Sequence, residues 1–167
     1  PLDEGYPADV ADYVEAARLH AVGMKDEARN LWKGILEKPA EARRHRSVWA
    51  AWMLAKTSTD HAECLEWYRR VVREASSGAS DVLKLGPAAK AWLAPGNEDP
   101  IAAIHDFHEA FVNGKASVEV DLRHAAADLL ENADPDQLAA AAADPLARRL
   151  LNLHLQATFE QPRDGSY

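Results

Sequence analysis

The sequence predicts an all-α protein made of short, antiparallel helical hairpins. Apolar residues recur with the 3.6-residue period of amphipathic helices along most of the 167 residues. Most glycine and proline residues fall between these periodic segments, where they end helices, rather than inside them. No segment alternates apolar and polar residues for long enough to predict a strand, and the short links between segments favour antiparallel neighbours.

Three Asp-Pro pairs mark predicted helix starts. In each pair the aspartate can cap the helix with its carboxylate, and the proline fills the first helical position, where its missing N–H costs nothing. An apolar, helix-favouring run follows each pair. The pairs are Asp99-Pro100, Asp134-Pro135 and Asp144-Pro145.

Together with glycine and proline stops, these starts predict nine helices. They cover about residues 8–22, 25–38, 41–56, 60–76, 80–93, 99–112, 117–132, 134–143 and 144–158. We expect one helical domain over residues 1–159, followed by a flexible polar tail at 160–167.

The second, fourth and sixth predicted helices share an internal pattern. A small residue is followed after three positions by an aromatic residue, and after two more by a small or β-branched residue. The three copies start at Ala28, Cys64 and Ala103, which are 36 and 39 residues apart. Their aromatic residues are Trp32, Tyr68 and Phe107, and their last members are Ile35, Val71 and Ala110. We expect Cys64 to be a buried, unreactive member of this pattern.

This pattern resembles the second helix of the tetratricopeptide repeat, a helix-turn-helix unit of about 34 residues. The resemblance covers about residues 9–113, although the spacings exceed 34 and Trp52 stands where the family has a small residue. It implies a right-handed α-solenoid with repeats at about 9–40, 41–78 and 80–113, completed by helices over 117–158. The alternative is a helical bundle without repeats.

The resemblance also implies a binding surface, because the first helix of each such unit lines the inner face of the stack. On this chain that face would hold Tyr13, His20, Arg46, Trp49, Met53, Lys56 and Trp92. Tryptophan, tyrosine and arginine are the residue types that dominate peptide-binding surfaces. The alternative is that these aromatic residues pack in the core. The family's carboxylate-binding positions hold Tyr13, Ala17, Trp49 and Met53 here, so that binding mode is not expected.

The net charge of −8 excludes some classes of partner. Residues 1–85 carry 13 Lys/Arg and 14 Asp/Glu, and residues 86–167 carry 6 and 13. So acidic a chain is poorly suited to nonspecific nucleic-acid binding or to an anionic membrane surface. No apolar window is long enough to span a bilayer. We therefore expect a protein or peptide partner, or self-association within a longer repeat array.

Seven basic residues form two clusters that could hold an anion. They are Arg43, Arg44, His45, Arg46, Arg69, Arg70 and Arg73. Guanidinium groups suit carboxylates and phosphates. The alternative is pairing within the chain with Glu37, Glu41, Glu66 or Glu74, or simple solvation.

One alternative function is enzymatic. His105 and His108 are three residues apart and can share a helix face. The pair His105-Asp106 is similar to that of the all-helical HD-type phosphohydrolases, for which His61 and Asp128 would be the nearest further ligands. Our main hypothesis has no metal, cofactor or catalytic residue. The sequence is compatible with two locations for the protein: the cytoplasm, or an exported form whose signal peptide has been removed.

Overall fold

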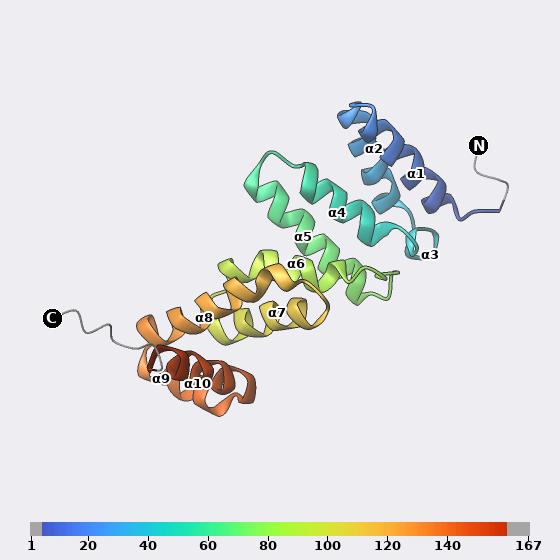
Figure 1. The fold of residues 1–167 in the computed structure, drawn as a ribbon. Coiled ribbons are helices and arrows are strands. Elements are labelled where there is room, and N and C mark those ends of the chain that lie inside the picture. The colour runs from blue at the N-terminus through green and yellow to red at the C-terminus, as the bar shows by residue number, and fades with distance from the viewer. Residues whose placement is uncertain (1–4, 160–167) are drawn as a thin grey trace. The chain divides into compact units, whose positions relative to one another are not determined.

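The structure is a computed structural model that describes residues 5–159, so the predicted tail lies outside the described residues. The described part contains ten α-helices and no β-strand (Figure 1). They are α1 (Ala8–Ala21), α2 (Lys25–Glu37), α3 (Ala40–Arg43), α4 (Ser47–Thr57), α5 (His61–Ser76), α6 (Leu85–Leu93), α7 (Pro100–Val112), α8 (Glu119–Asn132), α9 (Pro135–Ala143) and α10 (Pro145–Phe159). None of these helices is long and apolar enough to cross a membrane.

The all-α prediction is confirmed, and so are the three helix starts predicted from Asp-Pro. Asp99 accepts hydrogen bonds from the backbone N–H groups of Ile101 and Ala102 at the start of α7. Asp134 forms a reciprocal capping box with Gln137 at the start of α9. Asp144 accepts from the backbone of Ala147 in α10 at 2.8 Å.

The prediction of one continuous helix over residues 41–56 is wrong. The chain instead forms α3 and α4, separated by a turn at residues 44–46. The cause is the carboxylate of Asp9, which is fully buried in the first turn of α1. Its Oδ2 accepts from the backbone N–H groups of His45 and Arg46, both at 2.8 Å. Both N–H groups bind this carboxylate, and the Arg46 N–H also donates to the Arg43 carbonyl at 3.3 Å, which is a turn contact that does not extend α3 into α4.

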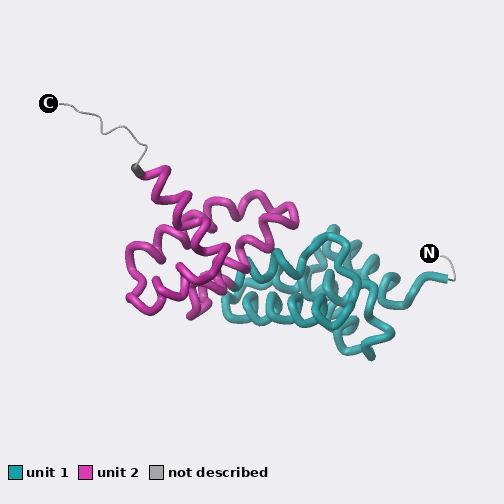
Figure 2. Tube along the Cα trace, turned by 90° about the horizontal axis from the view of Figure 1, so that it is seen from below, with its two compact units in different colours: residues 1–93 teal, residues 94–167 magenta. Residues whose placement is uncertain are grey.

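The chain divides into two compact units, Pro1–Leu93 and Ala94–Tyr167 (Figure 2). The boundary places α6 in unit 1 and α7 in unit 2, so the third predicted repeat, at 80–113, is shared between them. The charge divides along the same line. Unit 1 has 14 Lys/Arg and 14 Asp/Glu, whereas unit 2 has 5 and 13 and carries the whole net charge of −8.

Within unit 1, helices that follow one another in the chain pack together. α1 packs against α2, α2 against α4, α4 against α5, and α5 against α6. The repeat-pattern residues of this unit form the centre of its core: Ala28, Trp32, Ile35, Tyr68 and Val71 are buried. Cys64 is only half-buried, so the expectation of full burial is wrong at that position.

Within unit 2, α7 packs against α8, and α10 packs against both α8 and α9. The third copy of the pattern is also internal, since Ala103, Phe107 and Ala110 are buried. The aromatic positions of the pattern are therefore core positions in both units.

A second buried acid, Glu74 of α5, binds Arg43, the last residue of α3 before the turn at residues 44–46. Its carboxylate pairs with Arg43 at 3.1 Å and with Arg70 at 2.6 Å. Burial raises the pKa of Glu74, but the hydrogen bonds from Arg43 and Arg70 and the charge of Arg70 outweigh this effect, and the pKa lies below its ordinary value of 4.5.

The Asp9 turn can be tested by truncation. We expect Asp9→Ala to lower the free energy of unfolding by about 2 kcal/mol, because two backbone N–H groups lose their acceptor. The matched control is Glu41→Ala, an exposed acid of α3, for which we expect a change within about 0.5 kcal/mol. Urea denaturation followed by circular dichroism measures both. Equal stability of the two variants would show that Asp9 does not hold the turn.

The Glu74 network predicts a specific dependence of stability on pH. A lowered pKa in the folded state stabilises the protein above the unfolded-state pKa of about 4.5, and this stabilisation is lost as the pH falls through the lowered value. We expect Glu74→Gln to cost about 2 kcal/mol at pH 7 and progressively less below pH 4.5. The control is Glu66→Gln, whose exposed pairs should contribute less than about 0.5 kcal/mol. A Glu74→Gln deficit that is constant between pH 7 and pH 3 would contradict the assignment.

Candidate functional site

Four of the seven predicted surface residues lie on one face of α4. Arg46 occupies the N-cap position of the helix without a side-chain capping bond. Trp49, Met53 and Lys56 follow at intervals of three or four residues, which is the spacing of neighbours on a helix surface. We call these four residues, together with Tyr13 of α1 and Trp92 of α6, the α4 stripe. The structure therefore brings six of the seven predicted residues to α4 or to its two ends.

At the start of α4, three residues of the stripe form a cluster. The ring centroids of Tyr13 and Trp49 lie 5.9 Å apart with an edge-to-face angle of 81°. The guanidinium carbon of Arg46 lies 5.1 Å from the Trp49 ring centroid and 5.8 Å from that of Tyr13. Burial raises the pKa of the Tyr13 hydroxyl despite the positive charge of Arg46. Cation–π attraction thus holds Arg46 against two aromatic rings.

At the end of α4, the stripe presents an exposed tryptophan. Trp92 is 55% exposed, yet its ring stacks on Tyr68 of α5 at 5.5 Å with an angle of 6° between the planes. Lys56 places its amino group 5.5 Å from the Trp92 ring centroid. Tyr68 is itself fixed, because it is buried and packs edge-to-face against Trp52. Burial raises the pKa of Tyr68 to about 12, so its hydroxyl stays neutral.

The start of α6 explains why Trp92 reaches Tyr68. Asp81 accepts hydrogen bonds from the backbone N–H groups of Leu85 and Gly86, at 2.7 and 2.8 Å, and so caps the helix. Gly86 allows the close approach of α6 to α5, since a Cβ atom there would lie 2.9 Å from the Cβ of Ala75. A residue with a side chain at position 86 would push the two helices apart.

The stripe combines core packing with exposure, so the alternative that its aromatic residues pack in the core holds only in part. Tyr13, Trp49 and Met53 pack against the core of unit 1 and are half-buried, whereas Lys56 and Trp92 are exposed. The inner part of the stripe is therefore held rigidly, and its outer edge faces solvent.

His20 does not join this group. Its ring lies 5.6 Å from that of Trp32, a fully buried residue of α2. We therefore leave His20 out of the candidate surface, since its ring contact is with the core rather than with α4.

The basic clusters mostly pair within the chain. Arg43 and Arg70 bind Glu74, and Arg69 and Arg73 bind Glu66. This outcome matches the alternative of internal pairing for four of the seven residues.

The histidines of α7 do not assemble a metal site in the described part of the chain. His105 Nε2 lies 3.0 Å from Asp144 Oδ2, at the start of α10. A hydrogen bond to the Ala147 backbone and then the His105 contact keep the pKa of Asp144 below its ordinary value. Among the described residues, no group of three or more His, Cys, Asp or Glu side chains is arranged to hold a metal ion.

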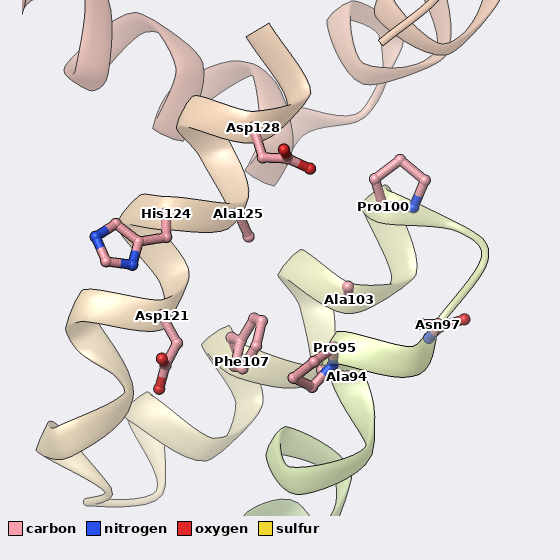
Figure 3. Close-up of a pocket in the computed structure, with 10 residues that line it drawn as sticks. All are labelled: Ala94, Pro95, Asn97, Pro100, Ala103, Phe107, Asp121, His124, Ala125 and Asp128. Atoms are coloured by element: carbon pink, nitrogen blue, oxygen red, sulfur yellow. The ribbon is translucent and has the colours of Figure 1, made fainter. Parts of the chain in front are cut away.

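Unit 2 contains a pocket that the sequence did not predict. Its volume is about 410 Å³, and it lies between α7, α8 and the segment that precedes α7. Figure 3 shows Phe107, Ala103 and Pro100 on the α7 side, and Asp121, Ala125 and Asp128 on the α8 side, with His124 at the edge. The spacing of Asp121, His124 and Asp128 on the predicted helix over 117–132 was the signal that could have indicated this polar face.

Comparison of the chain with known protein families, with curated proteins and with solved structures found no match.

Collisional quenching of tryptophan fluorescence tests the exposure of the stripe. Trp92 is the most exposed of the tryptophans, so we expect Trp92→Phe to remove about half or more of the quenching by iodide. Lys56→Gln should reduce quenching by anionic iodide but not by neutral acrylamide, because the lysine attracts the anion to the ring. Lys25→Gln, an exposed lysine of α2, is the control. An unchanged iodide response in Trp92→Phe would show that the ring is covered.

Proposed function

We propose that this chain is a protein- or peptide-binding scaffold and that the α4 stripe is its binding surface. The observation that carries the proposal is Trp92, a large aromatic ring that is more than half exposed and stacks on the buried ring of Tyr68. Apolar surface in contact with water is unfavourable in free energy, and a partner that covers it removes this contribution. Tryptophan is also enriched among the residues that dominate binding energies.

The support beneath the stripe favours binding. Tyr68 fixes the Trp92 ring from below, and the core fixes Trp49 and Met53. A partner would therefore meet side chains that are already ordered, and association would lose little side-chain entropy.

We also propose that the hairpins of unit 1 stack in the manner of tetratricopeptide repeats. Support comes from the packing of each helix against the next one along the chain, and from the burial of the pattern residues Ala28, Trp32, Tyr68 and Val71. In such a stack the first helices of successive units line one face, which is the role that we give to α1, α4 and α6.

We assign no catalytic step to this surface. Its residues are aromatic rings, a thioether, a lysine and an arginine, without a nucleophile paired to a base. The chemistry of the stripe suits recognition.

Selection from a displayed library of random twelve-residue peptides tests the proposal. We expect the full chain to enrich peptides that the double variant Lys56→Ala, Trp92→Ala does not retain, with a loss of affinity of about tenfold or more for the enriched peptides. The matched control is Lys25→Ala, Val82→Ala, which truncates an exposed lysine and an exposed apolar residue of unit 1 away from the stripe. Equal retention by the stripe variant and the control variant would refute the proposed surface, provided that circular dichroism shows equal helicity.

A further inference from the structure

The two helices at the centre of the stripe contain no acidic residue. α4 has the sequence SVWAAWMLAKT and α6 the sequence LGPAAKAWL, so neither supplies an aspartate or a glutamate. In the described part of the chain, neither Arg46 nor Lys56 forms an ion pair with a carboxylate. Each cation instead lies over aromatic rings.

The acids of the neighbouring α1 are already engaged elsewhere. Asp12 pairs with Lys38, and Glu15 pairs with Arg18. Asp9 binds the backbone N–H groups of the turn before α4 and makes no ion pair with a side chain among the described residues. None of the three forms an ion pair with the guanidinium of Arg46.

This arrangement differs from the other arginine clusters of the same unit. Arg43 and Arg70 share the buried Glu74, and Arg69 and Arg73 share Glu66. The guanidinium of Arg46 keeps donors for an external group, since the only hydrogen-bond acceptor that this side chain reaches among the described residues is the carbonyl of His45, at 3.4 Å. An arginine that is ordered by aromatic contacts has lost part of its rotamer freedom before an anion arrives.

We propose that the partner of the α4 stripe is a protein segment with two side-chain carboxylates that flank apolar residues. This inference rests on the proposed function and adds the chemistry of the partner. One carboxylate would bind Arg46 and the other Lys56, while the apolar residues between them contact Met53, Trp49 and Trp92.

The spacing of the two cations sets the spacing of the two acids. Arg46 and Lys56 are ten residues apart on α4, which is about 15 Å at 1.5 Å per residue. An extended peptide covers about 16 Å in five residues. The segment should therefore carry its acidic residues about five positions apart, with the apolar side chains at the positions between them.

A single-stranded nucleic acid also uses cations and exposed aromatic rings. The observations favour an acidic protein segment, because the stripe offers two cations and the whole chain has a net charge of −8, which repels a polyphosphate backbone. An acidic segment that uses only two carboxylates can bind Arg46 and Lys56 without a basic surface around them.

The test uses the full chain and three ten-residue peptides, acetylated and amidated so that no terminal charge contributes. The first has two glutamates five positions apart with leucines between them; the second has glutamine and the third lysine at the same two positions. Binding is followed through the indole N–H resonances of Trp49 and Trp92 in nuclear magnetic resonance spectra, assigned with Trp→Phe variants. A single-stranded oligothymidylate of ten nucleotides is the fourth ligand.

We expect the glutamate peptide to shift both indole resonances and to bind at least about fivefold more tightly than the glutamine peptide, with the lysine peptide weakest. Arg46→Gln and Lys56→Gln should each remove most of the preference for glutamate over glutamine, and Lys25→Gln should leave it unchanged. Added salt should weaken the glutamate peptide more than the glutamine peptide.

The opposing results are distinct. Equal affinity for the glutamate and glutamine peptides, or a preference for lysine, would overturn the acidic partner and leave the proposed peptide-binding surface intact. Tighter binding of the oligothymidylate than of any peptide would replace the protein partner by a nucleic acid. No indole shift with the glutamate peptide at about 5 mM would overturn the acidic partner, and the library selection would decide separately whether the stripe binds other peptides.

Discussion

The surface of unit 1 depends on one buried carboxylate. Asp9 leaves water completely, a change that is costly for a charged group unless strong hydrogen bonds replace its solvation. Hydrogen bonds from two backbone N–H groups offset part of this desolvation free energy. The same bonds interrupt a helix that would otherwise continue. The interruption places Arg46 at the N-cap position of α4, where its side chain lies against Tyr13 and Trp49. A polar group in the core thus determines the position of a cation at the surface.

Most of the helices could be predicted because their signals are local. The caps at Asp99, Asp134 and Asp144 depend only on the residues that follow each aspartate, and the 3.6-residue period fixes which residues of a helix share a face. The register implied by the resemblance to tetratricopeptide repeats, read with this period, also grouped Arg46, Trp49, Met53 and Lys56. Local signals could not predict the turn at residues 44–46, because its acceptor, Asp9, lies about 36 residues earlier in the chain.

The other features that the sequence did not predict also depend on contacts between separate helices. Whether Arg43 and Arg70 bind an external anion or Glu74 depends on which helices meet, and the sequence left both options open. The exposure of Trp92 depends on the closeness of α5 and α6, which Gly86 permits. The pocket of unit 2 exists only because α7 faces α8. His20 lies on α1, the helix that supplies Tyr13 to the stripe, but its ring packs on Trp32 instead of joining the stripe.

The unequal charge of the two units has a consequence for the chain at its isoelectric point. Unit 1 has equal numbers of formal positive and negative charges at pH 7, so any proton that it gains on acidification makes it positive. When the chain as a whole reaches zero charge, unit 2 must therefore still be negative by the same amount. At zero net charge, unit 1 is therefore positive and unit 2 is negative. Copies of the chain would attract one another through these oppositely charged units.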